Sequence, residues 1–178
     1  MSRSEIRIAG AGGQGIVTAG RILAEAAVLS GSHATQNQVY GPQSRGGASR
    51  SDVVIADEAI GFPLAQSIGL LVALSSEAYS RYQPEAEKEC RLIVDSRCGS
   101  ASGDGMASVL PMVDTARAVS GGELVTGVVA LGVLHALVHV VDGKALRSAL
   151  QARVPDRHRE MNLAALDAGR LLANRRAA

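Results

Sequence analysis

Hydrophobic and polar positions follow two different periods along the chain. Short apolar runs bounded by glycine or polar residues are typical of buried strands, whereas apolar residues three or four positions apart are typical of helices. The first pattern predicts strands at Glu5–Ala9, His33–Gln36, Ser51–Ala56, Gly69–Leu74, Arg91–Asp95 and Ser108–Pro111. The second predicts helices at Gly15–Ser30, Ser76–Arg81, Thr115–Ser120, Leu124–Val141, Lys144–Arg153 and Arg159–Asn174.

This alternation of strands and helices predicts an α/β fold in which helices cover both faces of a sheet. The segments Leu70–Leu74 and Leu92–Val94 are continuously apolar, as expected of strands that are covered on both faces. We therefore predict a three-layer α/β/α fold. Its sheet should be mostly parallel or mixed, with a Rossmann-like strand–helix–strand unit at the N-terminus. No change of composition marks a linker, so residues 1–178 are expected to form a single domain.

The N-terminal unit contains the most informative motif of the chain. A short apolar strand runs into a turn made of Gly10, Gly12, Gly13, Gln14 and Gly15, and an amphipathic helix follows. This arrangement aims backbone N–H groups at an anion, and glycine lets a ligand or another backbone approach closely. The motif predicts an anion-binding loop. The alternative is that the glycines only allow the helix and the strand to pack closely.

A dinucleotide site would need one more feature. In such sites an Asp or Glu at the end of the second strand, about 20 residues after the glycines, binds the ribose. Here the second strand leads into Thr35, Gln36, Asn37 and Gln38, and none of these is a carboxylate. The sequence therefore disfavours ordinary NAD binding.

Composition excludes several other classes of function. The net charge is +1, which gives no electrostatic basis for binding nucleic acid. Four aromatic residues offer no evident platform for stacked bases. The two cysteines, Cys90 and Cys98, cannot complete a four-thiolate iron–sulfur site or a structural zinc site.

The longest apolar segment requires a separate interpretation. Leu124–Val141 has about the minimum length that spans a bilayer, but Thr126, His135 and His139 interrupt it, so we predict a buried helix. The start of the chain, Met1–Glu5, lacks the apolar stretch of a secretory signal. A cytoplasmic protein without membrane contact is expected.

A search for catalytic groups finds no complete constellation. His135 and His139 have the i, i+4 spacing of metal ligands, but only Asp142 is a nearby carboxylate. The other interpretation is a polar stripe on a mostly buried helix. Neither a G-x-S-x-G nor an H-E-x-x-H motif occurs. We therefore predict no catalytic residue and no metal site, as in a binding subunit.

Three segments occur together in the order and spacing of one family. They read Gly-Ala-Gly-Gly-Gln-Gly (10–15), Tyr-Gly-Pro-Gln-Ser-Arg-Gly-Gly-Ala-Ser (40–49) and Ser-Asp-Val-Val-Ile (51–55). With them the chain resembles, over nearly its whole length, the gamma subunit of the 2-oxoacid:ferredoxin oxidoreductases, which include pyruvate, 2-oxoglutarate and 2-ketoisovalerate enzymes. The family pattern has an Asn just before the helix near Val128, where this chain has Thr126 and Gly127.

The resemblance implies an activity that belongs to a complex. Such complexes oxidatively decarboxylate a 2-oxoacid with coenzyme A and yield an acyl-CoA, carbon dioxide and reduced ferredoxin. Thiamine diphosphate, magnesium and iron–sulfur clusters would lie on alpha, beta and, where present, delta subunits. This chain is then expected to bind no cofactor by itself, to be inactive alone, and to form a symmetric dimer when isolated. The alternative function is a stand-alone nucleotide-binding enzyme with a Rossmann-like fold.

A second loop is the other candidate for contacts. Tyr40, Gly41, Arg45, Gly46 and Gly47 lie in a glycine-rich and proline-rich segment that is too irregular for a helix or strand. Arginine and tyrosine are enriched at interface hot spots, and an arginine between glycines has room to pair with a phosphate. We predict that this loop holds coenzyme A or contacts the alpha or beta subunit.

Overall fold

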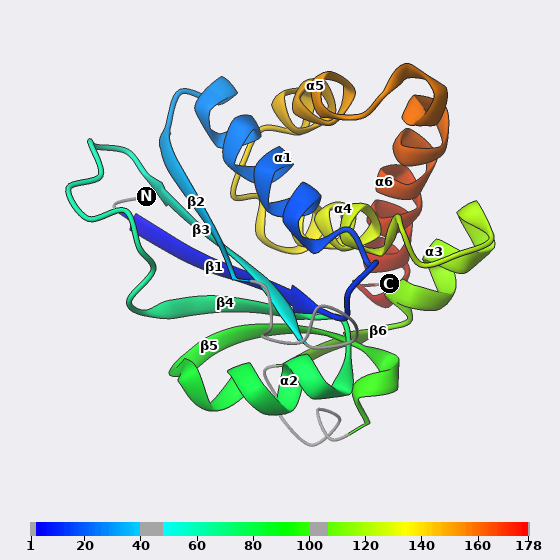
Figure 1. The fold of residues 1–178 in the computed structure, drawn as a ribbon, viewed down its shortest axis with the longest axis horizontal. Helices are drawn as coiled ribbons and strands as arrows, with labels where there is room; N and C mark the ends of the chain where they lie inside the picture. Colours follow the sequence, from blue (N-terminus) through cyan, green and yellow to red (C-terminus); the bar gives the residue numbers. More distant parts are fainter. Residues whose placement is uncertain (1–2, 40–47, 100–106, 178) are drawn as a thin grey trace.

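The computed structural model describes residues 3–39, 48–99 and 107–177 (Figure 1). In chain order the strands and helices are β1 (Arg3–Gly10), α1 (Ile16–Leu29), β2 (His33–Val39), β3 (Ser49–Ala56), β4 (Ile68–Ala73), α2 (Ser76–Tyr82), β5 (Ala86–Asp95), β6 (Ala107–Leu110), α3 (Met112–Ser120), α4 (Thr126–Val138), α5 (Gly143–Arg153) and α6 (Asp156–Ala177). Two short 3-10 turns, η1 (Gln83–Glu85) and η2 (Ser96–Cys98), flank β5. Every predicted strand and helix is present, and the predicted α/β fold is confirmed.

The sheet is mixed, with the strand order β2-β3-β1-β4-β5-β6. β1, β4, β5 and β6 run parallel to one another, and β3 runs antiparallel to both of its neighbours. In a Rossmann unit the strands before and after the first helix are adjacent. Here β3 lies between β1 and β2 and pairs with β1 from Arg3↔Ala56 to Gly10↔Ser49. The end of β2, where a ribose-binding carboxylate would lie, is therefore one strand farther from the glycines.

The two faces of the sheet are covered unequally. In Figure 1, α1, α4, α5 and α6 lie on one side of the sheet, and only α2 lies on the other. Alternate residues of β1 point to opposite sides: Ile6 and Ile8 belong to the large core beneath the helices, whereas Ala9 belongs to the smaller core around α2. The three layers are thus a thick helical layer, the sheet and a thin layer on the other face.

The longest apolar segment forms a buried helix, as predicted. All residues of α4 from Thr126 to His135 are buried. The predicted end at Val141 is corrected, because His139 adopts a left-handed backbone conformation (φ 54°) and its N–H donates to the carbonyl of His135. None of the helices in the described part of the chain is long and apolar enough to cross a membrane.

Candidate functional site

The glycine loop, defined as residues 10–15, lies where the chain leaves the sheet in opposite directions. β1 continues into α1 on one face, and the neighbouring parallel strand β4 continues into α2 on the other (Figure 1). The backbone N–H of Leu74 donates to the carbonyl of Ala9 at 2.8 Å, which joins the ends of the two strands. In open α/β sheets ligands bind outside the carboxyl ends of the strands at such a switch point. The fold therefore places the predicted anion-binding loop at the expected location for a ligand.

The side chain of Gln14 occupies the inside of this loop. Gln14 is 2% exposed, and its Oε1 accepts the backbone N–H of Ala11 at 2.9 Å. Its Nε2 donates to the carbonyl of Leu74 at 3.3 Å and to Oε2 of Glu123 at 2.9 Å. One amide thus satisfies three buried or half-buried partners from three parts of the chain. Gln14 holds the loop in shape and, because all its bonds are internal, does not face a ligand.

The four glycines of the loop divide into two pairs. Gly10 and Gly15 are required for packing, because a Cβ at Gly10 would collide with the amide of Gln14 and a Cβ at Gly15 would lie 2.5 Å from the carbonyl oxygen of Leu124. Gly12 and Gly13 are exposed, and a Cβ on either would have no neighbour within 4 Å among the described residues. The packing interpretation accounts for the first pair. Only the exposed tip, Gly12 and Gly13, has room for a ligand or a partner.

The departure from the family pattern lies where the glycine loop meets α4. The N–H of Gly127 donates to the carbonyl of Gln14 at 2.8 Å, and a Cβ at Gly127 would lie 2.7 Å from the carbonyl oxygen of Gly15. The hydroxyl of Thr126 donates to the carbonyl of Glu123 at 2.7 Å. Gly127 therefore joins the loop to the helix through a backbone bond, whereas the hydroxyl of Thr126 bonds within the turn that precedes α4.

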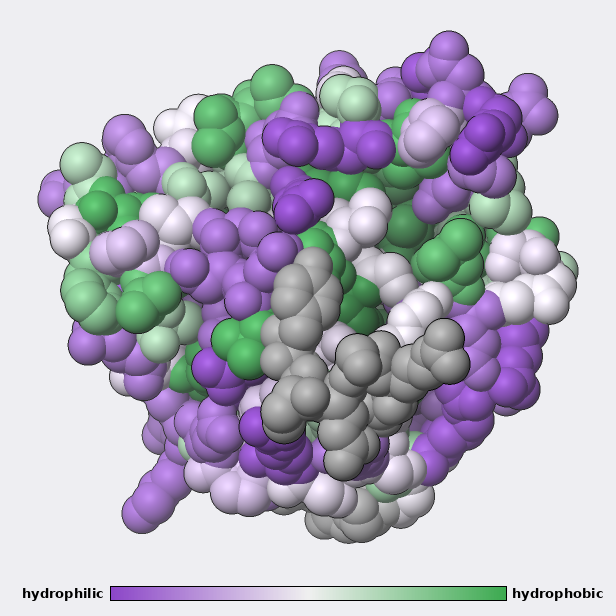
Figure 2. All heavy atoms as spheres, in the orientation of Figure 1, coloured by the Kyte–Doolittle hydropathy of each residue, from purple (hydrophilic) through white to green (hydrophobic). Residues whose placement is uncertain are grey.

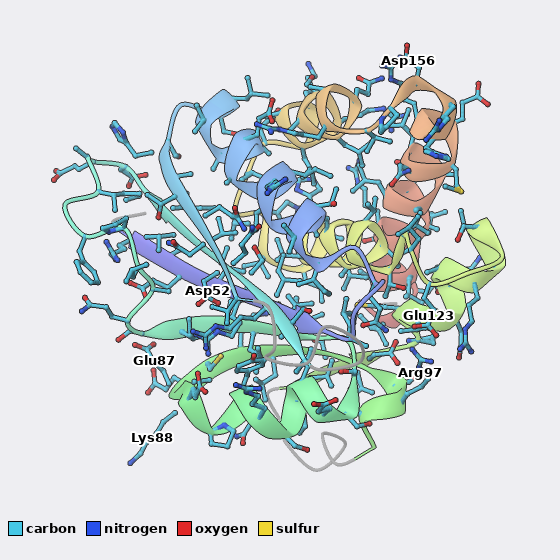
Figure 3. All side chains as sticks on the ribbon, in the orientation of Figure 1. Asp52, Glu87, Lys88, Arg97, Glu123 and Asp156 are labelled. Atoms are coloured by element: carbon cyan, nitrogen blue, oxygen red, sulfur yellow. The ribbon has the colours of Figure 1, made fainter. Side chains whose placement is uncertain are left out.

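Charged side chains extend from the loop along the carboxyl edge of the sheet. Oε1 of Glu123 pairs with Arg97 at 3.4 Å and with Arg117 at 2.7 Å, and Figure 3 shows Glu123 and Arg97 side by side. The amide of Gln14 lowers the pKa of the Glu123 carboxyl, and the two guanidiniums add to this effect. Arg97 also donates to the fully buried Asp95 at 3.1 Å. Both arginines at this edge are therefore already paired with carboxylates.

The second predicted loop lies outside the described residues. This applies to all five positions for which a contact was predicted: Tyr40, Gly41, Arg45, Gly46 and Gly47. The residues on either side are described. Val39 ends β2, and Ser49 begins β3 opposite Gly10. On the C-terminal side of the segment, the described chain thus lies beside Gly10, the first residue of the glycine loop.

A second charged cluster, which the sequence analysis missed, lies on the thinly covered face of the sheet. Arg7 is 4% exposed and contacts Asp52 through two hydrogen bonds of 2.8 and 3.0 Å. Its third nitrogen pairs with Glu85. The guanidiniums of Arg7 and Arg50 lie 5.1 and 5.4 Å from the centre of the Tyr82 ring. Arg7 and Asp52 are directly opposite in the β1–β3 register. A charged residue within each of two apolar strands was therefore the sequence signal that could have indicated this cluster.

The predicted pair of histidines is separated by the end of α4. His135 is buried, whereas His139 is exposed and caps the helix, with the ring centres 5.3 Å apart. The i, i+4 spacing thus brings the two rings into contact, although His139 lies one residue past the end of α4. Burial lowers the pKa of His135, and the positive charge of Arg170 adds to this. In the described ranges, no group of three or more His, Cys, Asp or Glu residues could hold a metal ion.

Comparisons with known proteins agree over the length of the chain. A family model described as pyruvate ferredoxin/flavodoxin oxidoreductase matches residues 5–172. The 2-oxoglutarate synthase subunit KorC of Methanothermobacter marburgensis is 40% identical over 96% of both chains. The KorC subunit of Archaeoglobus fulgidus is 39% identical over 81% of this chain and 79% of its own length.

Solved structures show the same fold. The gamma subunit of a keto/oxoacid ferredoxin oxidoreductase from Geobacter sulfurreducens is 38% identical, with a TM-score of 0.84 over 98% of both chains. A pyruvate oxidoreductase subunit, PORC, from Thermotoga maritima covers 95% of this chain with a TM-score of 0.78 at 21% identity, which supports the fold alone. The resemblance noted in the three sequence segments is confirmed. The chain therefore belongs to the pyruvate ferredoxin/flavodoxin oxidoreductase family, as a gamma-type subunit of a 2-oxoacid:ferredoxin oxidoreductase.

Proposed function

We propose that the chain is the gamma subunit of a complex that oxidises 2-oxoglutarate. The reaction joins 2-oxoglutarate to coenzyme A with loss of carbon dioxide, and two electrons pass to ferredoxin. The observation that supports this substrate is the order of similarity. The 2-oxoglutarate synthase subunits are 38–40% identical to the chain, whereas the ketoisovalerate oxidoreductase subunits are 33% and 28% identical.

The partners in this proposal are alpha, beta and, where present, delta subunits, which carry thiamine diphosphate, magnesium and iron–sulfur clusters. The described residues support a non-catalytic role, since Arg97 and Arg117 at the switch point both pair with Glu123. We therefore place the decarboxylation on the partners. The gamma subunit contributes a rigid surface beside the site of reaction.

Purification with its partners tests this assignment. The chain is co-expressed with the products of neighbouring genes, and the purified complex is assayed for viologen reduction with 2-oxoglutarate, pyruvate or 2-oxoisovalerate. We expect thiamine-dependent and coenzyme A-dependent reduction, with kcat/KM for 2-oxoglutarate the highest of the three. A higher kcat/KM for another 2-oxoacid would refute 2-oxoglutarate as the preferred substrate. Oxidation of 2-oxoacids by the isolated chain would refute the proposal that the reaction takes place on the partner subunits.

We further propose that the exposed tip of the glycine loop and Arg45 hold the anionic end of coenzyme A. Gly12 and Gly13 are exposed at the start of α1, whose dipole stabilises an anion by about 0.3–1 kcal/mol. Gly10 pairs with Ser49, two residues past the segment that contains Arg45. Charged hydrogen bonds such as one between arginine and phosphate contribute about 1.5–3 kcal/mol.

Arg45→Ala in the assembled complex separates coenzyme A binding from subunit contact. Loss of one charged contact should raise KM for coenzyme A about 10-fold or more, while decarboxylation of the 2-oxoacid in the absence of coenzyme A continues. Arg157→Ala, an exposed arginine on α6, serves as the matched control. An unchanged KM in a normally assembled Arg45→Ala complex would refute the proposal. Failure of assembly would instead support an interface role for the loop.

A further inference from the structure

The outer edge of the sheet is β2, and no described strand pairs with its far side. β2 pairs with β3 from His33↔Ala56 to Val39↔Arg50. An unpaired edge presents a row of backbone N–H and C=O groups that can bond to another strand. Natural edge strands are commonly protected by lysine, proline or a bulge, but β2 reads His-Ala-Thr-Gln-Asn-Gln-Val. Its composition therefore permits pairing with a further strand.

Exposed apolar side chains border this edge. Val28 and Leu29, at the end of α1, are 56% and 55% exposed. On the opposite face a turn of residues 57–67 crosses β2, where the carbonyl of Pro63 accepts from Thr35 at 2.7 Å and from Asn37 at 3.0 Å. In Figure 2 hydrophobic side chains gather over the end of α1 and over this turn. Apolar surface beside an unpaired edge is typical of an interaction site.

We propose that β2 pairs with β2 of a second copy of this chain, antiparallel and about a two-fold axis at Gln36. The two six-stranded sheets would then join into one continuous sheet. In this register Gln36 faces itself, and Ala34 of each copy faces Gln38 of the other. The contact is isologous, which is the usual symmetry of a homodimer.

The charges on α1 favour a second copy of the chain as the partner that pairs with β2. Arg21 donates to the side chain of Gln38 at 3.4 Å, so it lies beside the last part of β2. Glu25 lies beside Ala34 and Gln36 in a groove of about 490 Å³, and the charged residues that line this groove also include Arg21 and Arg153. Because the two-fold axis brings Gln38 of one copy opposite Ala34 of the other, Arg21 of each copy approaches Glu25 of the other. Opposite charges thus meet twice across the axis, and Glu25 keeps its existing pair with Arg153.

The surface between these charges suits close packing of the two helices. Ala24 lies between Arg21 and Val28 on α1 and lines the same groove. A small residue at the centre lets two antiparallel helices approach, and the exposed Val28 and Leu29 would be covered on each side. Burial of these side chains adds a hydrophobic contribution to the backbone bonds between the strands.

The oligomeric state of the isolated full-length chain tests the surface. Leu29→Lys introduces a charge beside β2, whereas Leu171→Lys makes the same change on α6, where the leucine is 60% exposed. By sedimentation equilibrium we expect dimers for the parent chain and for Leu171→Lys, and a dimer Kd at least about 10-fold higher for Leu29→Lys. A parent chain that is monomeric at about 100 µM would refute the dimer. Equal Kd values for the two variants would refute the proposal that the dimer contact lies beside β2.

Cysteine crosslinking tests the register. Under mild oxidation Gln36→Cys should form a covalent dimer, because only this residue of β2 faces its own copy across the axis. Gln38→Cys alone should not crosslink, but it should do so when mixed with Ala34→Cys. The parent chain, in which Cys90 and Cys98 are buried, is the control. A persistent dimer without the Gln36→Cys crosslink would overturn the register. A monomeric chain would leave the 2-oxoglutarate assignment untouched, so the two proposals fail separately.

Discussion

Gln14 and Glu123 lie 109 positions apart in the chain and form a hydrogen bond of 2.9 Å between Nε2 and Oε2. This bond joins the glycine loop after β1 to the turn between α3 and α4. The same amide also bonds to Ala11 and Leu74. The loop is therefore held from inside by a side chain of its own motif.

Replacement of Gln14 by alanine should destabilise the chain. The variant leaves the N–H of Ala11 and the carbonyl of Leu74 without their side-chain partner, and an unsatisfied buried polar group costs about 1–3 kcal/mol. The free energy of unfolding, measured with urea, should fall by about that amount. Gln151→Ala, at an exposed position of α5, is the control and should change it by less than about 0.5 kcal/mol. Equal effects of both variants would contradict the role of Gln14.

The two pairs of glycines in the loop should respond differently to alanine. Gly15 has φ +73° and lies against Leu124, so Gly15→Ala should lose about 1–3 kcal/mol of stability through backbone strain, with the collision adding to this. Gly12→Ala meets no atom within 4 Å in the described part of the chain and should leave the melting temperature nearly unchanged. If Gly12 contacts coenzyme A in the complex, Gly12→Ala should raise the KM for coenzyme A without loss of stability. A large destabilisation by Gly12→Ala would argue against the described geometry.

The buried pair of Arg7 and Asp52 should be far more sensitive than an exposed pair. Asp52→Ala leaves the guanidinium of Arg7 buried and only partly compensated by Glu85, a type of change that costs about 3–5 kcal/mol. Arg147 and Asp167 form an exposed pair at 3.2 Å, and Asp167→Ala should cost no more than about 1 kcal/mol. Urea unfolding of the two variants provides the comparison. Similar losses of unfolding free energy in the two variants would mean that the Arg7–Asp52 pair contributes no more than an exposed pair.

Stability should depend on the ionisation of Glu123 at acid pH. Its folded-state pKa is lowered below the ordinary value of 4.5, first by the amide of Gln14 and then by Arg97 and Arg117. The stabilisation is therefore present above pH 4.5 and is lost as pH falls through the lower folded-state pKa. Glu123→Gln should show a shallower loss of unfolding free energy below pH 4.5 than the parent chain. Identical pH profiles would contradict this assignment.

Much of the fold follows from local pattern. Continuous apolar runs predict β4 and β5 because both faces of these strands are covered, and helical spacing predicts α1 and α6. The end of α4 was predicted three residues too late, because Val140 and Val141 are apolar and the left-handed conformation of His139 is not visible in hydrophobic spacing. Patterns of hydrophobicity report burial, and they do not report backbone conformation.

Local patterns and motifs predict the strands and helices, the family and the position of the glycine loop between β1 and α1. The position of β3 between β1 and β2 is visible only in the folded sheet. Alternation indicates which residues face a core, but it does not indicate which strand lies alongside. The folded structure also places the side chain of Gln14 inside the loop, where it bonds to Glu123, and pairs Arg7 with Asp52. These contacts join residues 109 and 45 positions apart, and such partners are brought together only when the whole sheet and its helices pack.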